Sequence, residues 1–199
     1  MKNKIKDILL EYGHKGIFTH DGHFQCLTDK AARSSQVGHS YDHVYPDLLN
    51  KFLGLEKFTM FEIGIHKGYS LEMWTKIFPQ ADIYGLDIDH SLIDPYANLN
   101  QKNITILPQA SQIDTNILNL IPNMDLIIDD ASHRPDLTMR SWEIFKHKLN
   151  KNGLYIIEDV PDTIFNEQVF PKSFKDNFKL IDLRSVKNRS DDIILYYEN

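Results

Sequence analysis

Residues 61–70 read FEIGIHKGYS, and this stretch decides the fold. The apolar run Phe58–Ile63 leads into it and ends at Gly64, and helical spacing follows from Tyr69 to Phe78. A buried strand that turns through glycine into a helix is a ligand-binding unit of open α/β sheets. Glycine lets the backbone turn sharply and approach a ligand closely, and the helix start offers unpaired N–H groups. We therefore predict a nucleotide-binding turn here.

Strands and helices alternate along the rest of the chain. Further strands are predicted at Asp82–Leu86, Asn103–Leu107, Asp125–Ile128, Leu154–Ile157, Phe178–Leu183 and Ile193–Tyr197. A helix is predicted over Leu137–Leu149 and closed by Asn152-Gly153. Short β-branched runs between helices indicate a mostly parallel sheet that is buried on both faces. The fold class predicted is α/β: one domain over residues 1–199, with a doubly wound, seven-stranded, Rossmann-like core over 58–199.

Residues 1–57 are predicted to form an N-terminal helical cap on this core. A first helix is expected over Lys4–Tyr12, where apolar residues recur at helical spacing, and a second over Tyr41–Phe52. The polar stretch between them contains His20 and His23, which we interpret as part of a loop rather than a metal site. The apolar face of the first helix makes a homodimer a candidate assembly.

The composition is typical of a globular protein: 42% of the residues are hydrophobic, 25% are charged, and the net charge is −6. No long basic run is present, so neither a nucleic-acid backbone nor an anionic membrane surface is an expected partner. The N-terminus lacks signal-peptide features, and no apolar stretch approaches the roughly 20 residues that a membrane span needs. The single cysteine, Cys26, excludes an internal disulfide. We expect a cytoplasmic protein.

Carboxylates follow the predicted strands at their C-terminal ends. They are Glu62, Asp87, Asp129, Asp130, Glu158 and Asp159. Because the carboxyl ends of parallel strands meet at one edge of a sheet, and ligands bind there, we expect these acids to form one rim. The alternative is that these acids are solvated loop residues. In that case they would be scattered along the sequence rather than placed regularly at the ends of strands.

Glu62 separates the turn from a dinucleotide site. The turn carries Glu62 and two glycines four residues apart, Gly64 and Gly68, in place of G-x-G-x-x-G. A carboxylate at this position disfavours a pyrophosphate and suits a cationic ligand that bears an amino acid, such as S-adenosylmethionine (SAM). Asp87, at the end of the next strand, is placed to accept hydrogen bonds from ribose hydroxyls.

Asp130, Glu158 and Asp159 are predicted to share one divalent cation. Three carboxylates without paired histidine or cysteine favour a hard ion, Mg²⁺ or another such cation, over zinc. Without a cation they would repel one another. His133 follows Asp130 by three residues, and an imidazole suits a general base at neutral pH. A capping or core histidine is the alternative, which the neighbouring acids disfavour.

Four segments resemble class I SAM-dependent methyltransferases, in particular the macrocin and mycinamicin sugar O-methyltransferases and the related cephalosporin-hydroxylase-like proteins. The segments are FEIGIHKGYSLEMW, IYGLDID, LIIDDASH and GLYIIEDV, and the resemblance extends over about residues 28–192. It implies a methyltransferase sheet, Mg²⁺ on Asp130, Glu158 and Asp159, and His133 as the catalytic base beside Asp130.

The resemblance also implies contacts with the cofactor. Residues 109–114 are similar to the family's G-D-Q-S-D, with Gln112 retained and Ser111 in place of the usual aspartate. Thr28-Asp-Lys30, His39, Tyr41 and Tyr45 resemble a segment that closes over the cofactor. The predicted cofactor contacts are Tyr41, Glu62, Gly64, Gly68, Ser70, Asp87, Ser111, Gln112 and Asp129.

The predicted function is methyl transfer from SAM to a hydroxyl of a sugar or glycosylated small molecule, with a divalent metal and His133 as base. An NAD-dependent oxidoreductase or epimerase is an alternative that Glu62 and the missing G-x-G-x-x-G disfavour. A non-catalytic SAM-binding subunit is another, disfavoured by the complete set of acids and histidine. Nitrogen as the accepting atom also stays open.

Overall fold

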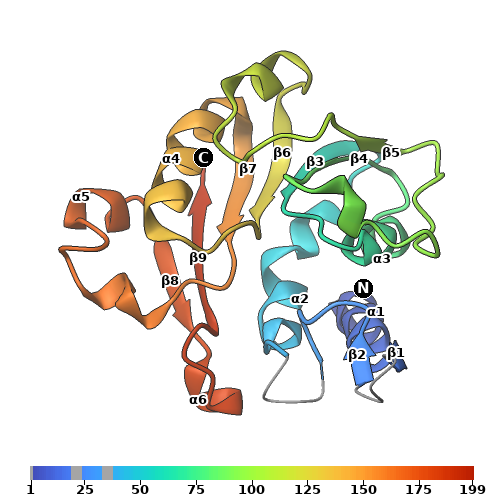
Figure 1. Cartoon of the computed structure of the whole chain (residues 1–199), viewed down its shortest axis with the longest axis horizontal. Helices are drawn as coiled ribbons and strands as arrows, with labels where there is room; N and C mark the ends of the chain where they lie inside the picture. Colours follow the sequence, from blue (N-terminus) through green and yellow to red (C-terminus); the bar gives the residue numbers. More distant parts are fainter. Residues whose placement is uncertain (1, 19–23, 33–37) are drawn as a thin grey trace.

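The computed structural model describes residues 2–18, 24–32 and 38–199. Its main sheet has seven strands in the order β5-β4-β3-β6-β7-β9-β8 (Figure 1). The strands are β3 (Phe58–Ile63), β4 (Ala81–Leu86), β5 (Ile104–Ile106), β6 (Met124–Asp129), β7 (Leu149–Ile157), β8 (Lys179–Asp182) and β9 (Ile193–Glu198). The first five in this order run parallel, whereas β9 is antiparallel to β7 and to β8. The predicted seven-stranded, mostly parallel sheet is confirmed.

Six α-helices accompany the sheet in the described part of the chain. They are α1 (Lys2–His14), α2 (Tyr45–Leu48), α3 (Tyr69–Ile77), α4 (Pro135–Phe145), α5 (Lys172–Lys175) and α6 (Arg184–Lys187). Helix α3 connects β3 to β4, and α4 leads from β6 to β7. These two crossovers make the sheet doubly wound, because they leave the centre of the sheet in opposite directions.

The sheet separates two hydrophobic cores. Along β3, Met60 lies in the core that contains Trp74 of α3, whereas its neighbour Phe61 lies in the core of α4. The ring of Phe61 meets that of Phe145 edge-on, with the ring centres 5.3 Å apart. Successive side chains of a strand point to opposite faces, so an apolar strand such as β3 requires cover on both sides.

Helix α1 completes the first core. Ile5, Leu9 and Tyr12 are buried in the same core as Trp74, and the hydroxyl of Tyr12 donates to Oε1 of Glu72 at 2.6 Å. The apolar face of this helix is therefore covered within the chain. The homodimer was predicted from this apolar face, which is packed within the chain. The homodimer stays a prediction, and the apolar face no longer supports it.

The predicted continuous helix over residues 41–52 is wrong. The structure breaks it into a 3₁₀ turn (Tyr41–His43), α2, and a second 3₁₀ turn (Asn50–Phe52). Pro46 lies in the first turn of α2. Because proline has no N–H, a helix that began at Tyr41 would lose a hydrogen bond there, whereas a helix that begins at Tyr45 loses none.

Two further details differ from the sequence prediction. Asn152 and Gly153 do not close α4 but lie inside β7, where Asn152 takes a left-handed conformation with φ 65°. The polar stretch before residue 40 contains the strands β1 (Gly16–Phe18) and β2 (Phe24–Cys26), which pair as an antiparallel hairpin.

No helix in the described ranges is long and apolar enough to cross a membrane. His20 and His23, which were assigned to a loop, lie outside the described residues.

Candidate cofactor and active site

The turn after β3 rests directly on the turn after β6. The N–H of Asp130 donates to the carbonyl of Ile63 at 2.9 Å, and the N–H of Gly64 donates to that of Leu86 at 2.8 Å. Gly64 has φ +89°, and a Cβ there would lie 2.2 Å from the Asp130 carbonyl oxygen and 2.6 Å from Cα of Ala131. Only glycine fits this crossing, which lies where the strand order of the sheet reverses.

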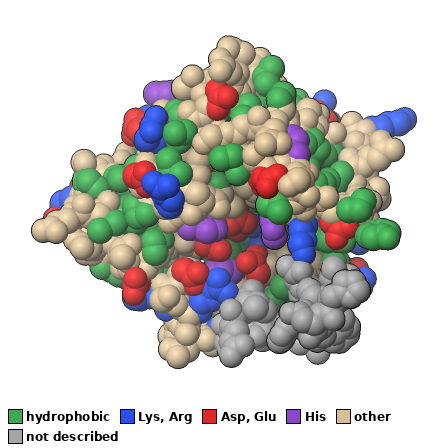
Figure 2. Space-filling model, in the orientation of Figure 1, with side chains coloured by type: hydrophobic (Ala, Val, Ile, Leu, Met, Phe, Trp, Pro, Cys, Tyr) green, Lys and Arg blue, Asp and Glu red, His purple; other side chains and the backbone are tan. Residues whose placement is uncertain are grey.

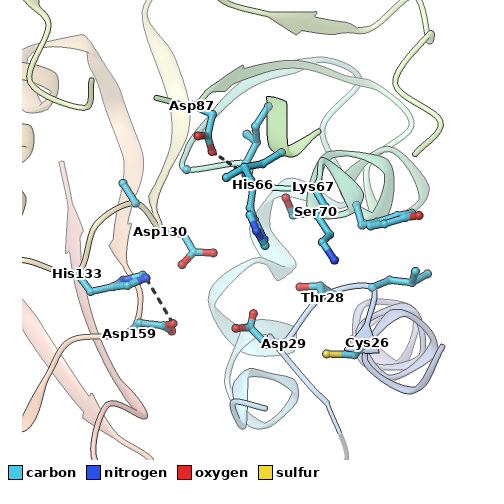
Figure 3. A pocket seen from close by; sticks show the side chains of 16 residues that line it. Cys26, Thr28, Asp29, His66, Lys67, Ser70, Asp87, Asp130, His133 and Asp159 are labelled. Carbon is cyan, nitrogen blue, oxygen red and sulfur yellow. Dashed lines mark hydrogen bonds and ion pairs between the residues drawn. The ribbon is translucent and has the colours of Figure 1, made fainter. Parts of the chain in front are cut away.

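Two adjoining cavities open at this crossing. The larger, of about 480 Å³, has on its walls the predicted site residues Gly64, Ser70, Asp87, Asp130, His133 and Asp159 (Figure 3). The smaller, of about 140 Å³, has Gly64, Asp87, Ser111 and Gln112. Figure 2 shows carboxylates and histidines gathered near the middle of this face. The structure thus brings most of the predicted site together.

The other predicted site residues do not line these two cavities. They are Tyr41, Glu62, Gly68, Asp129 and Glu158. Gly68 gives α3 its left-handed N-cap, with φ +83°. Asp129 accepts from the hydroxyl of Tyr155 at 3.4 Å, and burial raises the pKa of its carboxyl to about 6. Their direct roles in binding stay predictions.

Asp87 holds the turn and faces both cavities. Its Oδ2 accepts the N–H of His66 at 2.7 Å (Figure 3), which ties the end of β4 to the turn after β3. Its Oδ1 accepts the N–H of Asp89 at 2.9 Å within its own segment. The carboxylate that was predicted to read ribose therefore also shapes the turn.

A cation from the N-terminal segment lies inside the acidic rim. Lys30 is 1% exposed. Its Nζ donates to Oδ2 of Asp130 at 2.6 Å and to Oε2 of Glu158, and lies 3.5 Å from Oε1 of Glu62. Burial lowers the pKa of Lys30, but these carboxylates together raise it well above its usual value. A charged ammonium therefore joins the ends of three strands.

Glu158 is fully engaged on the inner side of the rim. Its Oε1 accepts from the hydroxyl of Tyr45 and its Oε2 from Lys30. Asp130 and Asp159, in contrast, line the larger cavity. Two of the three predicted metal ligands thus face the cleft, and the third is bound to side chains of the cap.

Asp159 lies between two histidines. Nε2 of the buried His39 is 3.0 Å from its Oδ2. Nε2 of His133 is 3.9 Å from the same oxygen (Figure 3). The hydroxyl of Tyr41 donates to Oδ1 of Asp159 and accepts its N–H at 2.9 Å. The buried Tyr41 therefore positions this carboxylate without itself lining the cleft.

The cleft side offers a compact set of metal-binding groups. Ligand atoms of Asp130, His133 and Asp159 all lie within 4.8 Å of one another. The side chain of His133 is 40% exposed. Three residues of the cleft that are not glycine have a positive φ, between 44° and 54°. They are His66, His133 and Asp159. Left-handed backbone of this kind gathers at ligand sites.

The pairing of Lys30 and of His39 with the rim was not predicted from the sequence. Lys30 was expected only in a segment over the cofactor. The available signal was charge: six acids at one edge need cations, and a metal was the only cation predicted there.

The proteins similar to this chain include O-methyltransferases. No family model matches the chain. Mycinamicin VI 2''-O-methyltransferase of Micromonospora griseorubida is 33% identical over 132 residues, which are 60% of this chain and 30% of that protein. The MycE methyltransferase of the mycinamycin biosynthetic pathway, solved with Mg and SAH, superposes with a TM-score of 0.53 at 28% identity, covering 68% of this chain and 36% of MycE.

The chain has the class I methyltransferase fold. Its resemblance to the mycinamicin and macrocin sugar O-methyltransferases is also confirmed. A solved cmcI structure with Mg and SAM shares the fold alone, because its sequence is only 21% identical. The two superpose with a TM-score of 0.58 over 87% of the present chain and 78% of the cmcI chain. The chain spans 30% and 31% of the length of the first two curated relatives that it matches.

Proposed function

We propose that the chain is a SAM-dependent O-methyltransferase. The observation that carries the proposal is the pair of adjoining cavities at the strand reversal, which share Gly64, Asp87 and Ala131. His133 lines the larger of the two. One cofactor that extends through both would pass over the glycine turn and place its far end beside a histidine. The names of the similar proteins, which include O-methyltransferases and structures with Mg and SAH or SAM, support this proposal.

The cofactor would lie along the carboxyl ends of β3, β4 and β6. The smaller cavity, between Ser111 and Leu137, would take the adenine. Asp87 would accept hydrogen bonds from the ribose, since its carboxylate borders both cavities. The methionine part would lie against Gly64 and Ser70, close to the buried carboxylate of Glu62.

The acceptor would enter the open part of the larger cavity. His133 is the proposed general base, because its side chain is exposed there and its Nε2 lies 3.9 Å from Oδ2 of Asp159. His133 would remove the proton of the acceptor hydroxyl as the oxygen attacks the methyl group. Orientation of two bound reactants would supply much of the rate.

The cleft residues fit a hard divalent ion. Asp130 and Asp159 would hold it with carboxylate oxygens, the ligands that Mg²⁺ prefers. When bound, such an ion would lower the pKa of a coordinated hydroxyl. The proposed acceptor is a small sugar or glycoside, because its neighbouring hydroxyls suit this site and because several similar proteins are named for glycosylated substrates.

Calorimetric titration with S-adenosylhomocysteine (SAH) and with NAD tests the cofactor. We expect binding of SAH and none of NAD, and the reverse result would favour an oxidoreductase or epimerase. Methyl transfer from labelled SAM to a panel of glycosides, with and without EDTA, tests the reaction. Binding of SAH without transfer to any glycoside would favour a non-catalytic subunit, and turnover that survives complete metal removal would exclude the metal.

A further inference from the structure

Two basic side chains enter the larger cavity from the turn between β3 and α3. They belong to His66 and Lys67, and both line the cavity (Figure 3). The N–H of His66 donates to Oδ2 of Asp87 at 2.7 Å, and the carbonyl of Lys67 accepts the N–H of Asp94 at 3.1 Å. Because the backbone of both residues is tied to the segment after β4, their side chains start from a fixed turn.

The charges on the wall of this cavity are unevenly placed. In Figure 3, Asp130, His133 and Asp159 lie on one side of the cavity and Lys67 on the opposite side, with His66 between them. Nε2 of His133 already lies 3.9 Å from Asp159. A negatively charged group of a ligand would be repelled on the acidic side. We therefore expect such a group near Lys67, on the side of the turn.

Helix α3 begins directly after these two residues. Its N-cap is Gly68, which has no side chain to accept the first N–H groups of the helix. The start of a helix carries a partial positive charge and favours an anion. Ser70, in the first turn of the helix, lines the same cavity. The helix start and the two basic side chains thus favour a negative charge on the same side of the cavity.

We propose that His66 and Lys67 bind the α-carboxylate of the methionine part of SAM. The proposal deepens the proposed function and rests on it, because it takes SAM as the cofactor. In the proposed position of the methionine part, the buried carboxylate of Glu62 suits the α-ammonium and would repel the α-carboxylate. The α-carboxylate is then directed to the turn, where Lys67 and the ring N–H of His66 would donate charge-assisted hydrogen bonds.

Calorimetric titration of the whole chain with two ligands tests the proposal. One is SAH, and the other is decarboxylated SAH, in which hydrogen replaces the α-carboxylate. We expect the unchanged protein to bind SAH at least about tenfold more tightly than the analogue. Lys67→Met should lower the affinity for SAH about tenfold and change that for the analogue by less than about threefold. Equal affinity of the unchanged protein for the two ligands overturns the proposal.

Conservative variants separate a lost contact from a damaged turn. His66→Gln keeps an N–H donor and should retain more SAH affinity than His66→Leu, and Lys67→Arg should retain more than Lys67→Met. Lys57→Met, at an exposed lysine paired with Asp82, should leave the binding of both ligands unchanged. If Lys67→Met weakens SAH and the analogue by the same factor, the lysine supports the turn rather than the carboxylate, and the proposal is wrong.

An anionic acceptor is the other possible source of the negative charge. If Lys67→Met and His66→Leu both bind SAH like the unchanged protein but bind glucuronic acid more weakly, the pair belongs to the acceptor and the proposal is overturned. The outcomes also separate the assignment from the proposed function. A protein that binds neither SAH nor its analogue refutes the proposed function, whereas a protein that binds both equally well refutes only the role of His66 and Lys67.

Discussion

Nε2 of His39 lies 3.0 Å from Oδ2 of Asp159, and both side chains are buried. Burial lowers the pKa of His39, but Asp159 and Asp192 together raise it to about 10. Burial raises the pKa of Asp159, but His39 lowers it to about 2. The two groups are therefore an ion pair across the neutral range, held between the cap and the end of β7.

This pair predicts how stability depends on pH. The folded protein keeps the His39 proton to about pH 10, whereas the unfolded chain releases it near 6.5. The contribution of His39 to the unfolding free energy is thus complete below pH 6.5 and is lost as pH rises towards 10, by up to about 1.4 kcal/mol per pH unit. Urea unfolding between pH 6.5 and 9.5 measures this slope. His39→Gln should flatten it, while His147→Gln, at an exposed histidine, should not. Equal slopes in all three proteins would contradict the prediction.

Gly64→Ala should damage the crossing of the two turns. The added Cβ would lie 2.2 Å from the Asp130 carbonyl oxygen in a backbone with φ +89°. We expect a loss of unfolding free energy on the order of 3 kcal/mol and loss of SAH binding. Gly54→Ala is the matched control, because its Cβ would meet nothing within 4 Å. Chemical denaturation compares the two, and similar stabilities would show that the turn tolerates a side chain.

His133→Ala should separate binding from chemistry. The side chain lines the larger cavity, is partly exposed, and is not part of either hydrophobic core. We expect kcat to fall by about 10²- to 10⁴-fold, while SAH affinity stays within about twofold. His147→Ala serves as the control for loss of an exposed histidine. Turnover that persists in His133→Ala would remove this residue from the reaction.

Asp87→Asn should weaken the cofactor site. The carboxylate accepts the N–H groups of His66 and Asp89 and borders both cavities. An amide accepts with one oxygen only, so we expect SAH affinity to fall about tenfold. Asp89→Asn, which changes a partly exposed capping residue two positions away, should have little effect. If both variants bind SAH like the unchanged protein, Asp87 does not read the ribose.

The sequence was sufficient to predict the strands of the sheet, because their apolar runs are short and are bounded by glycine, proline or charged residues. β3 has the predicted bounds, and β4 differs by one residue. The hairpin β1–β2 was missed because strands of three residues are too short to show alternation. The contact of Lys30 with Asp130 joins residues a hundred positions apart. No local sequence pattern predicts a contact between residues so far apart, because it depends on how the cap packs against the sheet.

The cap supplies the counter-charges of the sheet, and this has a consequence for cooperativity. Lys30 and His39, both from the cap, contact Glu62, Asp130, Glu158, Asp159 and Asp192 in the remainder of the chain. If the cap melted first, these carboxylates would lose their buried cations and the centre of the sheet would repel itself. The sequence pattern therefore changes at residue 57, but the cap and the sheet on either side of it are not separate units of stability. Cap and sheet are expected to unfold together in a single transition.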